Sequence, residues 1–235
     1  MRFRDIKLMH LQAVINNSKM AHPTRAAIKT LFTSLYKFAI KNDIADKDYA
    51  KFVDVGKREG MSKRKPFSND EINRLFECVD KLEFADTVLI MIYTGMRVGE
   101  LLALKTEDIH LDERYMIGGL KTEAGINRII PINRKIEPFI RKYYNEENEF
   151  LITNHKGEQM KYSNYRREKF DNVMEKLEIE HSPHDCRHTF ASLMDSANAN
   201  KLCIKRIMGH KAQDITDDVY THKTISELIK AIDLL

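Results

Sequence analysis

The sequence of 235 residues predicts a mainly α-helical protein with one small three-stranded antiparallel sheet, an α+β fold. Two patterns lead to this fold class. Apolar residues recur at three- and four-residue steps through most of the chain, which is the period of an amphipathic helix. Between residues 108 and 132 the pattern changes to short alternating segments separated by turn residues, which is typical of strands.

A basic linker divides the chain into two predicted domains. The segment Val55–Pro66 combines two glycines, a proline and a run of lysines and arginines, so we expect it to be exposed. The domain boundary lies within it, so that residues 1–62 form a helical module, with helices expected over 6–18 and 23–41. Residues 66–235 form the second domain.

The two parts differ in charge. Residues 1–65 hold 15 Lys and Arg against 6 Asp and Glu, whereas residues 66–235 hold 24 against 29. A basic module ahead of a mildly acidic domain suits binding to a polyanion, although a solvated, lysine-rich helical surface explains the charge equally well.

The second domain begins with a capping box, Ser68 to Glu71, which predicts a helix to about Val79. An apolar helix is expected over 84–94, ended by Gly95, and a short one over 97–104. Three strands are expected near residues 109–111, 115–117 and 126–130. Further helices are expected over 134–144, 163–178, 185–197, 200–208 and 224–235.

Composition places the protein among soluble globular proteins. Apolar residues make up 43% and charged residues 31%. The longest apolar run, Val88–Tyr93, is far shorter than the roughly 20 residues that span a bilayer, and no secretory signal is visible. Three cysteines without paired spacing fit reduced thiols. We therefore expect a cytoplasmic protein with no membrane partner.

Two arginines suggest an anion-binding site. In a helix over 185–197, Arg187 lies at the edge of the apolar stripe, and a guanidinium turned toward a core needs an anion. Arg97 repeats this arrangement in line with Leu101. Two such arginines can share one phosphate through bidentate hydrogen bonds. The alternative is a pair of structural salt bridges, for example Arg97 with Glu100.

Histidines cluster before Arg187. Three imidazoles and a thiol occur within a short stretch and make a zinc site an alternative: His181, His184, His188 and Cys186. Pro183 separates the first histidine from the others, and the thiol faces away from the last two. We therefore expect no metal ion.

The order of the remaining polar residues is more informative than any one of them. Arg97 lies in Thr94-Gly95-Met96-Arg97-Val98-Gly99-Glu100. It is followed by four further elements in sequence: Lys121 in a hairpin, His184-Asp185-Cys186-Arg187, Gly209-His210 and Tyr220. This order resembles the tyrosine recombinase family, the phage and transposon integrases, over roughly residues 66–222.

The resemblance implies a mechanism for strand cleavage. Tyr220 would attack the scissile phosphate and form a 3′-phosphotyrosyl link. Arg97 and Arg187 would hold the non-bridging oxygens, with His210 as a further donor. Lys121 would protonate the leaving 5′-oxygen, and His184 would assist proton transfer. No cofactor is implied, and the sequence has no Walker loop.

The resemblance also implies partners. Residues 1–62 are similar to a core-binding domain that clamps DNA, shortened as if its first helix were missing, and Thr24 and Arg25 are its expected phosphate donors. Double-stranded DNA, a tetramer of the protein on DNA, and accessory or directionality factors are the implied partners. The implied function is a site-specific recombinase that integrates or excises a mobile element.

Three alternatives remain open at this stage. A type IB topoisomerase uses the same set of residues, but the amphipathic tail 224–235 favours a recombinase because it suits docking on a neighbouring subunit. Packing of that tail within its own chain is the competing explanation. A DNA-binding protein without catalysis and a zinc-dependent hydrolase are the other two.

Overall fold

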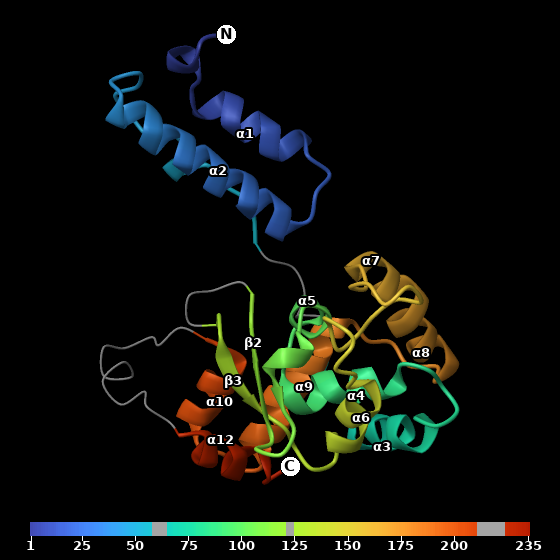
Figure 1. Ribbon diagram of the computed structural model, residues 1–235. Coiled ribbons are helices and arrows are strands. Elements are labelled where there is room, and N and C mark those ends of the chain that lie inside the picture. Colours follow the sequence, from blue (N-terminus) through green and yellow to red (C-terminus); the bar gives the residue numbers. More distant parts are fainter. Residues whose placement is uncertain (58–64, 121–124, 211–223) are drawn as a thin grey trace. The chain divides into compact units, whose positions relative to one another are not determined.

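The computed structural model describes residues 1–57, 65–120, 125–210 and 224–235. Contacts divide the chain into two compact units, Met1–Ser62 and Lys63–Leu235. Figure 1 shows two long helices in the first unit, and helices around a small sheet in the second. This architecture confirms the predicted fold class.

The first unit is built on two helices, α1 (Leu8–Asn17) and α2 (His22–Lys41), with short 3-10 turns η1 (Phe3–Asp5) and η2 (Ala50–Phe52). Its small core is formed by buried apolar side chains: Leu11, Ile15, Tyr36, Ala50 and Val53. The Tyr36 hydroxyl donates a 3.0 Å hydrogen bond to the Ile6 carbonyl. Both predicted helices are therefore confirmed.

Helix α4 (Ala85–Thr94) is the centre of the second unit, because every one of its residues is buried. A helix that is apolar on all sides must be enclosed by other elements. Helices α3 (Asn69–Cys78), α6 (Glu137–Tyr143) and α9 (Pro183–Ser196) pack against it. The Ser68–Glu71 capping box begins α3 as predicted, and Gly95 ends α4 in the left-handed conformation, with φ of 65°.

The sheet has the order β1-β2-β3, with β1 at Ile109–His110, β2 at Tyr115–Gly118 and β3 at Arg128–Pro131. Its strands are antiparallel, and Met116 pairs with both Ile109 and Ile130. Before β1 lie the short helix α5 (Val98–Leu102) and the turn η3 (Thr106–Asp108). The sheet thus follows directly from the segment that carries Arg97.

The predicted helix over 163–178 is interrupted. Helix α7 (Tyr162–Asn164) leads into a π-helical turn, η4 (Tyr165–Phe170), and then into α8 (Asp171–Lys176). The side chains of Tyr165 and Phe170 are both fully buried. Because these residues are five apart, a turn with i→i+5 hydrogen bonds places both on the same inner face.

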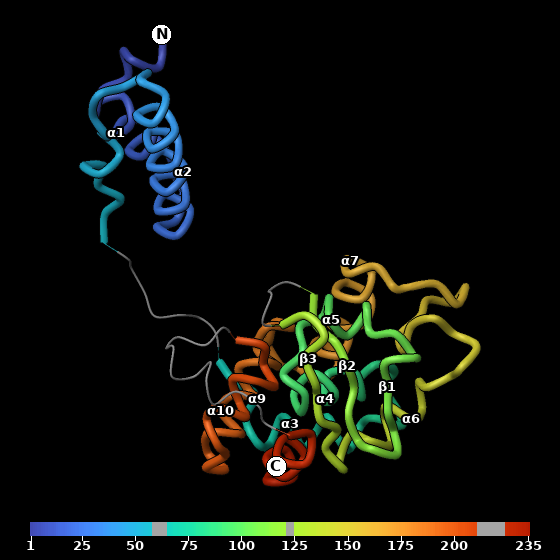
Figure 2. The backbone as a smooth tube through the Cα atoms, turned by 60° about the vertical axis from the view of Figure 1, so that its left-hand side comes forward, coloured from blue at the N-terminus to red at the C-terminus, as the bar shows by residue number. Residues whose placement is uncertain are grey.

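The C-terminal helix α12 (Ile225–Ile232) packs within its own chain against α10 (Lys201–Met208) and β3, as the two backbone views agree (Figures 1 and 2). Leu228 and Ile232 are buried there, and Asn133 donates a 2.7 Å hydrogen bond to the Ile232 carbonyl. Docking in cis removes the argument that this tail favours a recombinase over a topoisomerase. The apolar face that suggested a neighbouring subunit is already covered.

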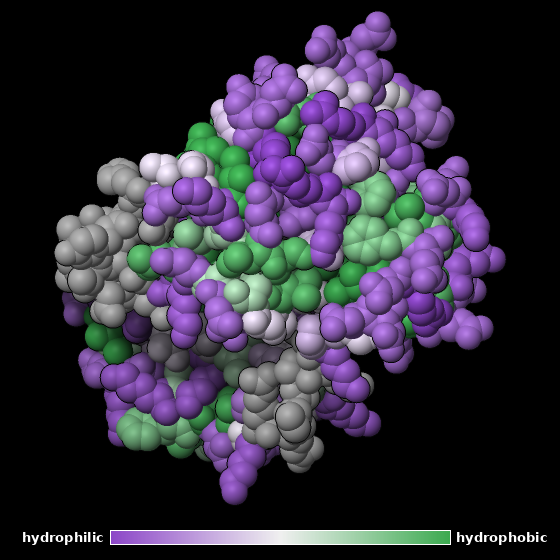
Figure 3. Space-filling view, turned by 90° about the horizontal axis from the view of Figure 1, so that it is seen from below, coloured by the Kyte–Doolittle hydropathy of each residue, from purple (hydrophilic) through white to green (hydrophobic). Residues whose placement is uncertain are grey.

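The described residues contain no helix that is both long enough and apolar enough to cross a membrane. Hydrophilic side chains predominate on the face shown in Figure 3, where apolar side chains reach the surface in a band across the middle.

Candidate active site

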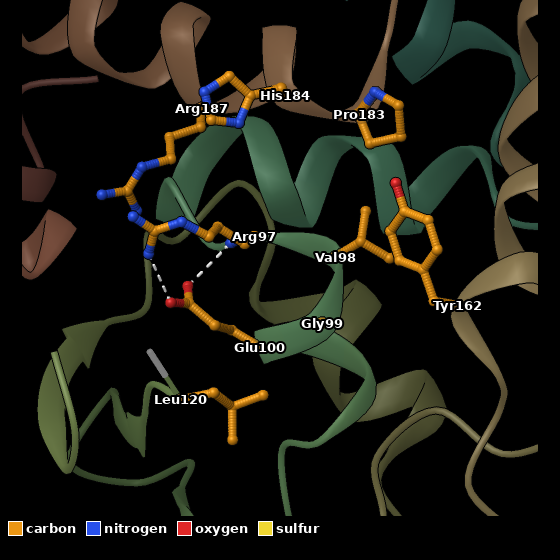
Figure 4. Close-up of a pocket in the computed structure, with 9 residues that line it drawn as sticks. All are labelled: Arg97, Val98, Gly99, Glu100, Leu120, Tyr162, Pro183, His184 and Arg187. Carbon is orange, nitrogen blue, oxygen red and sulfur yellow. Dashed lines mark hydrogen bonds and ion pairs between the residues drawn. The ribbon is translucent and has the colours of Figure 1, made fainter. Parts of the chain in front are cut away.

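The start of α5, the first turns of α9, Leu120 and Tyr162 of α7 surround a cavity of about 410 Å³ (Figure 4). Arg97, His184 and Arg187 lie on one part of its wall, and Leu120 and Tyr162 form an apolar part. The same two arginines and His184 also line an adjoining hollow of about 620 Å³, together with His188, Lys205 and His210. Four of the six predicted catalytic residues thus come together around two hollows that share three lining residues.

Arg97 is held at the cavity wall by the turn in which it lies. It is the N-cap of α5, with ψ of 152°, so the helix begins at Val98 rather than at Arg97 as predicted. Its backbone N–H donates to Glu100 Oε2 at 2.9 Å and its Nη1 to Glu100 Oε1 at 2.8 Å. The side chain remains 29% exposed, so its other donors can reach a ligand.

Arg187 reaches the site from α9 and is only 3% exposed. Its Nη1 donates a 2.6 Å hydrogen bond to the Gly95 carbonyl, and its Nη2 donates to the Met208 carbonyl. Burial, followed by the charge of Arg97, lowers the pKa of Arg187 to about 10, so it remains protonated at neutral pH. Figure 4 shows its guanidinium beside that of Arg97.

Glu100 balances part of this charge. Besides Arg97, its carboxylate binds Arg128, whose Nη2 lies 2.8 Å from Glu100 Oε2. Burial alone would raise the pKa of Glu100, but the hydrogen bonds and charges of Arg128 and Arg97 outweigh it and lower that pKa. The predicted salt bridge of Arg97 with Glu100 therefore exists, yet it leaves Arg97 facing the cavity.

Arg128 was not identified as a site residue from sequence. Its alternation with Ile126 and Ile130 predicted only a strand. The available signal was a charged residue in register with apolar ones, since a strand places residues two apart on the same face. Glu100 is the only acidic residue bonded to Arg97, Arg128 or Arg187 within the described part of the chain. The site is therefore cationic overall.

The histidines in and just before α9 have separate positions. The ring of His181 stacks on Phe67 at 3.8 Å and its Nε2 lies 3.3 Å from Glu71, whereas His184 is exposed and its ring lies 4.9 Å from that of His188. Cys186 is fully buried, and burial raises the pKa of its thiol. The groups that suggested zinc therefore do not converge. Among the described residues, no three potential ligands gather around one point.

His210 follows the end of α10, where Gly209 adopts φ of 65°. Partial desolvation, followed by the charges of Arg187, Arg97, Arg128 and Lys205, lowers the pKa of His210. The imidazole is therefore neutral at pH 7 and offers one N–H as a hydrogen-bond donor.

Two predicted catalytic residues, Lys121 and Tyr220, lie outside the described residues. Leu120, which precedes the first of them, lines the cavity. In the first unit Thr24 is exposed and Arg25 is half-buried near Gly56. Their backbone N–H groups both donate to the Ala21 carbonyl, so only their side chains are available to a phosphate.

Comparison with known proteins identifies the family. The model of the phage integrase family matches residues 65–227. The tyrosine recombinase XerD of Oceanobacillus iheyensis is 28% identical over 214 residues, which cover 83% of this chain and 69% of that protein.

Two solved structures share the fold. One is the Tn1549 transposon integrase in complex with circular intermediate DNA, with a TM-score of 0.77 and 20% identity over 97% of this chain and 85% of that one. The other is a lambda integrase tetramer bound to a Holliday junction, with a TM-score of 0.72 and 17% identity over 91% of this chain and 66% of that one. With the family match over residues 65–227, the chain belongs to the phage integrase family and is a DNA breaking and rejoining enzyme, a tyrosine recombinase.

Proposed function

We propose that this protein is a site-specific recombinase that integrates or excises a mobile element through a 3′-phosphotyrosyl intermediate. The phenolic oxygen of Tyr220 attacks the scissile phosphorus and loses its proton to solvent, a transfer that His184 assists. The new O–P bond replaces the bond from phosphorus to the 5′-oxygen, which leaves as a hydroxyl after accepting a proton from Lys121. Attack by another 5′-hydroxyl reverses these steps and releases Tyr220.

The main support for this proposal is that Arg97 and Arg187 lie on the same cavity wall, with their guanidinium groups side by side. In the proposed reaction they bind the two non-bridging oxygens, where negative charge grows in the transition state. Their segments are fixed before DNA arrives, because both side chains already hold backbone or carboxylate partners. The neutral imidazole of His210 supplies a further donor, and the exposed His184 assists proton transfer.

The basic first unit is proposed to clamp the duplex through its backbone. Its surplus of cations suits a polyanion, and the side chains of Thr24 and Arg25 are the proposed phosphate contacts. Assembly as a tetramer on DNA is proposed from the lambda integrase likeness, and accessory factors that set direction belong to the same proposal. We place the reaction in the cytoplasm, in line with the three free cysteines.

The test uses a library of nicked duplexes with randomised sequence. A nick beside the scissile phosphate lets a short 5′-hydroxyl fragment diffuse away, so a covalent protein–DNA adduct accumulates. We expect wild-type protein to form the adduct, mass spectrometry to locate DNA on Tyr220, and Tyr220→Phe to form none. Sequencing the trapped DNA then gives the recognition site.

The same experiment separates the alternatives. A DNA-binding protein without catalysis forms no adduct in either variant, and a zinc-dependent hydrolase loses activity with a chelator. A type IB topoisomerase forms the adduct on many sequences and relaxes a plasmid that lacks the selected site. A recombinase instead joins two DNA molecules that both carry that site.

A further inference from the structure

Arg128 is a deeply buried charged group beside the active site. Its side chain is 1% exposed, and it lines neither of the two hollows. Burying a guanidinium is costly unless its donors find partners. Three of them do, and the partners come from three separate parts of the second unit.

The first partner is Glu100, which holds Arg97 through both its backbone and its side chain. The second is the Ile207 carbonyl in the last turn of α10, which accepts from Arg128 Nε at 2.7 Å. The third is the Gly125 carbonyl, just before β3, which accepts from Nη1 at 3.3 Å. The planar guanidinium of arginine has N–H donors in several fixed directions, so it can bind three acceptors at once. The ammonium group of lysine is a single compact charge and cannot replace that arrangement.

The space around this guanidinium is closely filled. A Cβ atom added at Gly209 would lie 2.9 Å from Arg128 Cδ, and one added at Gly119 would lie 2.5 Å from Nη1. Both glycines have positive φ, 65° and 113°. The backbone on either side therefore closes directly onto Arg128, and Gly209 immediately precedes His210.

We propose that Arg128 is a positioning residue for strand cleavage, which fixes Glu100, and through it Arg97, relative to the end of α10 that carries His210. The inference rests on the proposed function, because it assigns Arg128 a part in the same reaction without contact with DNA. The competing explanation is that Arg128 only stabilises the fold.

Arg128→Lys separates these explanations because lysine keeps the positive charge but lacks the planar set of guanidinium donors. The assay is single-turnover adduct formation on the nicked duplex recovered from the library, with DNA affinity and thermal unfolding measured on the same samples. Displacing a catalytic group by about 1 Å can slow a reaction by about 100-fold. We expect cleavage by Arg128→Lys to slow by about 10- to 100-fold while DNA affinity changes less than about threefold.

Arg114→Lys is the matched control. Arg114 also holds a carboxylate and a carbonyl, those of Asp233 and Ile132, but it lines neither hollow. The Arg114→Lys substitution should lower the unfolding temperature without slowing DNA cleavage. If Arg128→Lys loses cleavage only in proportion to its loss of folded protein, the positioning role is wrong.

A modified substrate supplies a readout that a structural role would not move. A methyl group in place of one non-bridging oxygen makes the scissile linkage neutral. Its cleavage therefore depends less on stabilisation of negative charge by Arg97. The rate difference between wild type and Arg128→Lys should then shrink to less than about threefold. An unchanged difference would overturn the proposal. Failure of the wild type to form any adduct would instead overturn the proposed function, and the positioning role with it.

Discussion

The guanidinium of Arg187 donates a 2.6 Å hydrogen bond to the carbonyl oxygen of Gly95, a residue 92 positions earlier in the chain. Gly95 ends α4 and stands two residues before Arg97, so one arginine of the site fixes the backbone that presents the other. The two guanidiniums would repel each other without a ligand between them, and this hydrogen bond holds them close in the absence of DNA.

The conformation of Gly95 is therefore expected to be critical. A Cβ at Gly95 would lie 2.6 Å from Phe190 Cδ1, and φ there is 65°. We expect Gly95→Ala to lower the free energy of unfolding by about 2–4 kcal/mol, from left-handed backbone strain and overpacking together. Gly99→Ala is the control, because a Cβ there has no neighbour within 4 Å and it lies within α5. It should stabilise by about 0.5–1 kcal/mol in urea titrations. Equal effects would contradict this account.

Replacing Glu100 should lower the stability of the folded protein. Glu100→Gln leaves Arg128 buried without a counter-charge, which we expect to cost about 3–5 kcal/mol. Glu107→Gln is the control, since Glu107 is 73% exposed where it pairs with Lys105 and should matter by less than about 1 kcal/mol. Denaturant titration at pH 7 measures both.

Acid sensitivity provides a second test of the same pair. Because the pKa of Glu100 is lowered in the folded protein, its stabilising effect is complete above the unfolded pKa of about 4.3 and is lost as pH falls through the folded value. The difference in free energy of unfolding between wild type and Glu100→Gln should therefore become smaller below about pH 4. A constant difference would mean that the carboxylate charge is not what stabilises Arg128.

Local signals in the sequence predicted most of the elements. The capping boxes at Ser68 and Thr224 begin helices where expected, because the side chain that satisfies the first turn lies only three residues from its partner. Gly95 ends α4 for a similarly local reason. The order of Arg97, His184, Arg187 and His210 also predicted which described residues would meet.

Tertiary relationships could not be predicted in the same way. The pair of Glu100 and Arg128 joins a helix to a strand, and no periodicity links their positions. The π turn at Tyr165–Phe170 depends on a core that both rings enter. The sequence could not show that α12 docks in cis, because an amphipathic helix has the same apolar face whether it packs on its own chain or on another.

His210 should make stability depend on pH near neutrality. Its folded pKa is lowered, so the unfolded chain binds more protons as pH falls below about 6.5, and stability from this group falls with it. We expect the unfolding temperature to fall between pH 7 and 5.5 more in wild type than in His210→Asn. His155→Asn, at an exposed loop histidine, is the control. Identical slopes in wild type and His210→Asn would show that a lowered pKa of His210, from desolvation and neighbouring cations, does not cause the pH dependence.

The docking of α12 in cis predicts how the free protein unfolds. Leu228 is 1% exposed, so Leu228→Ala should lower the free energy of unfolding by about 2–5 kcal/mol, whereas Leu234→Ala, at a side chain 55% exposed, should change it by less than about 1 kcal/mol. Because the contact is within one chain, the denaturation midpoint without DNA should not depend on protein concentration. A midpoint that rises with concentration in wild type but not in Leu228→Ala would show that the helix binds a neighbouring subunit instead.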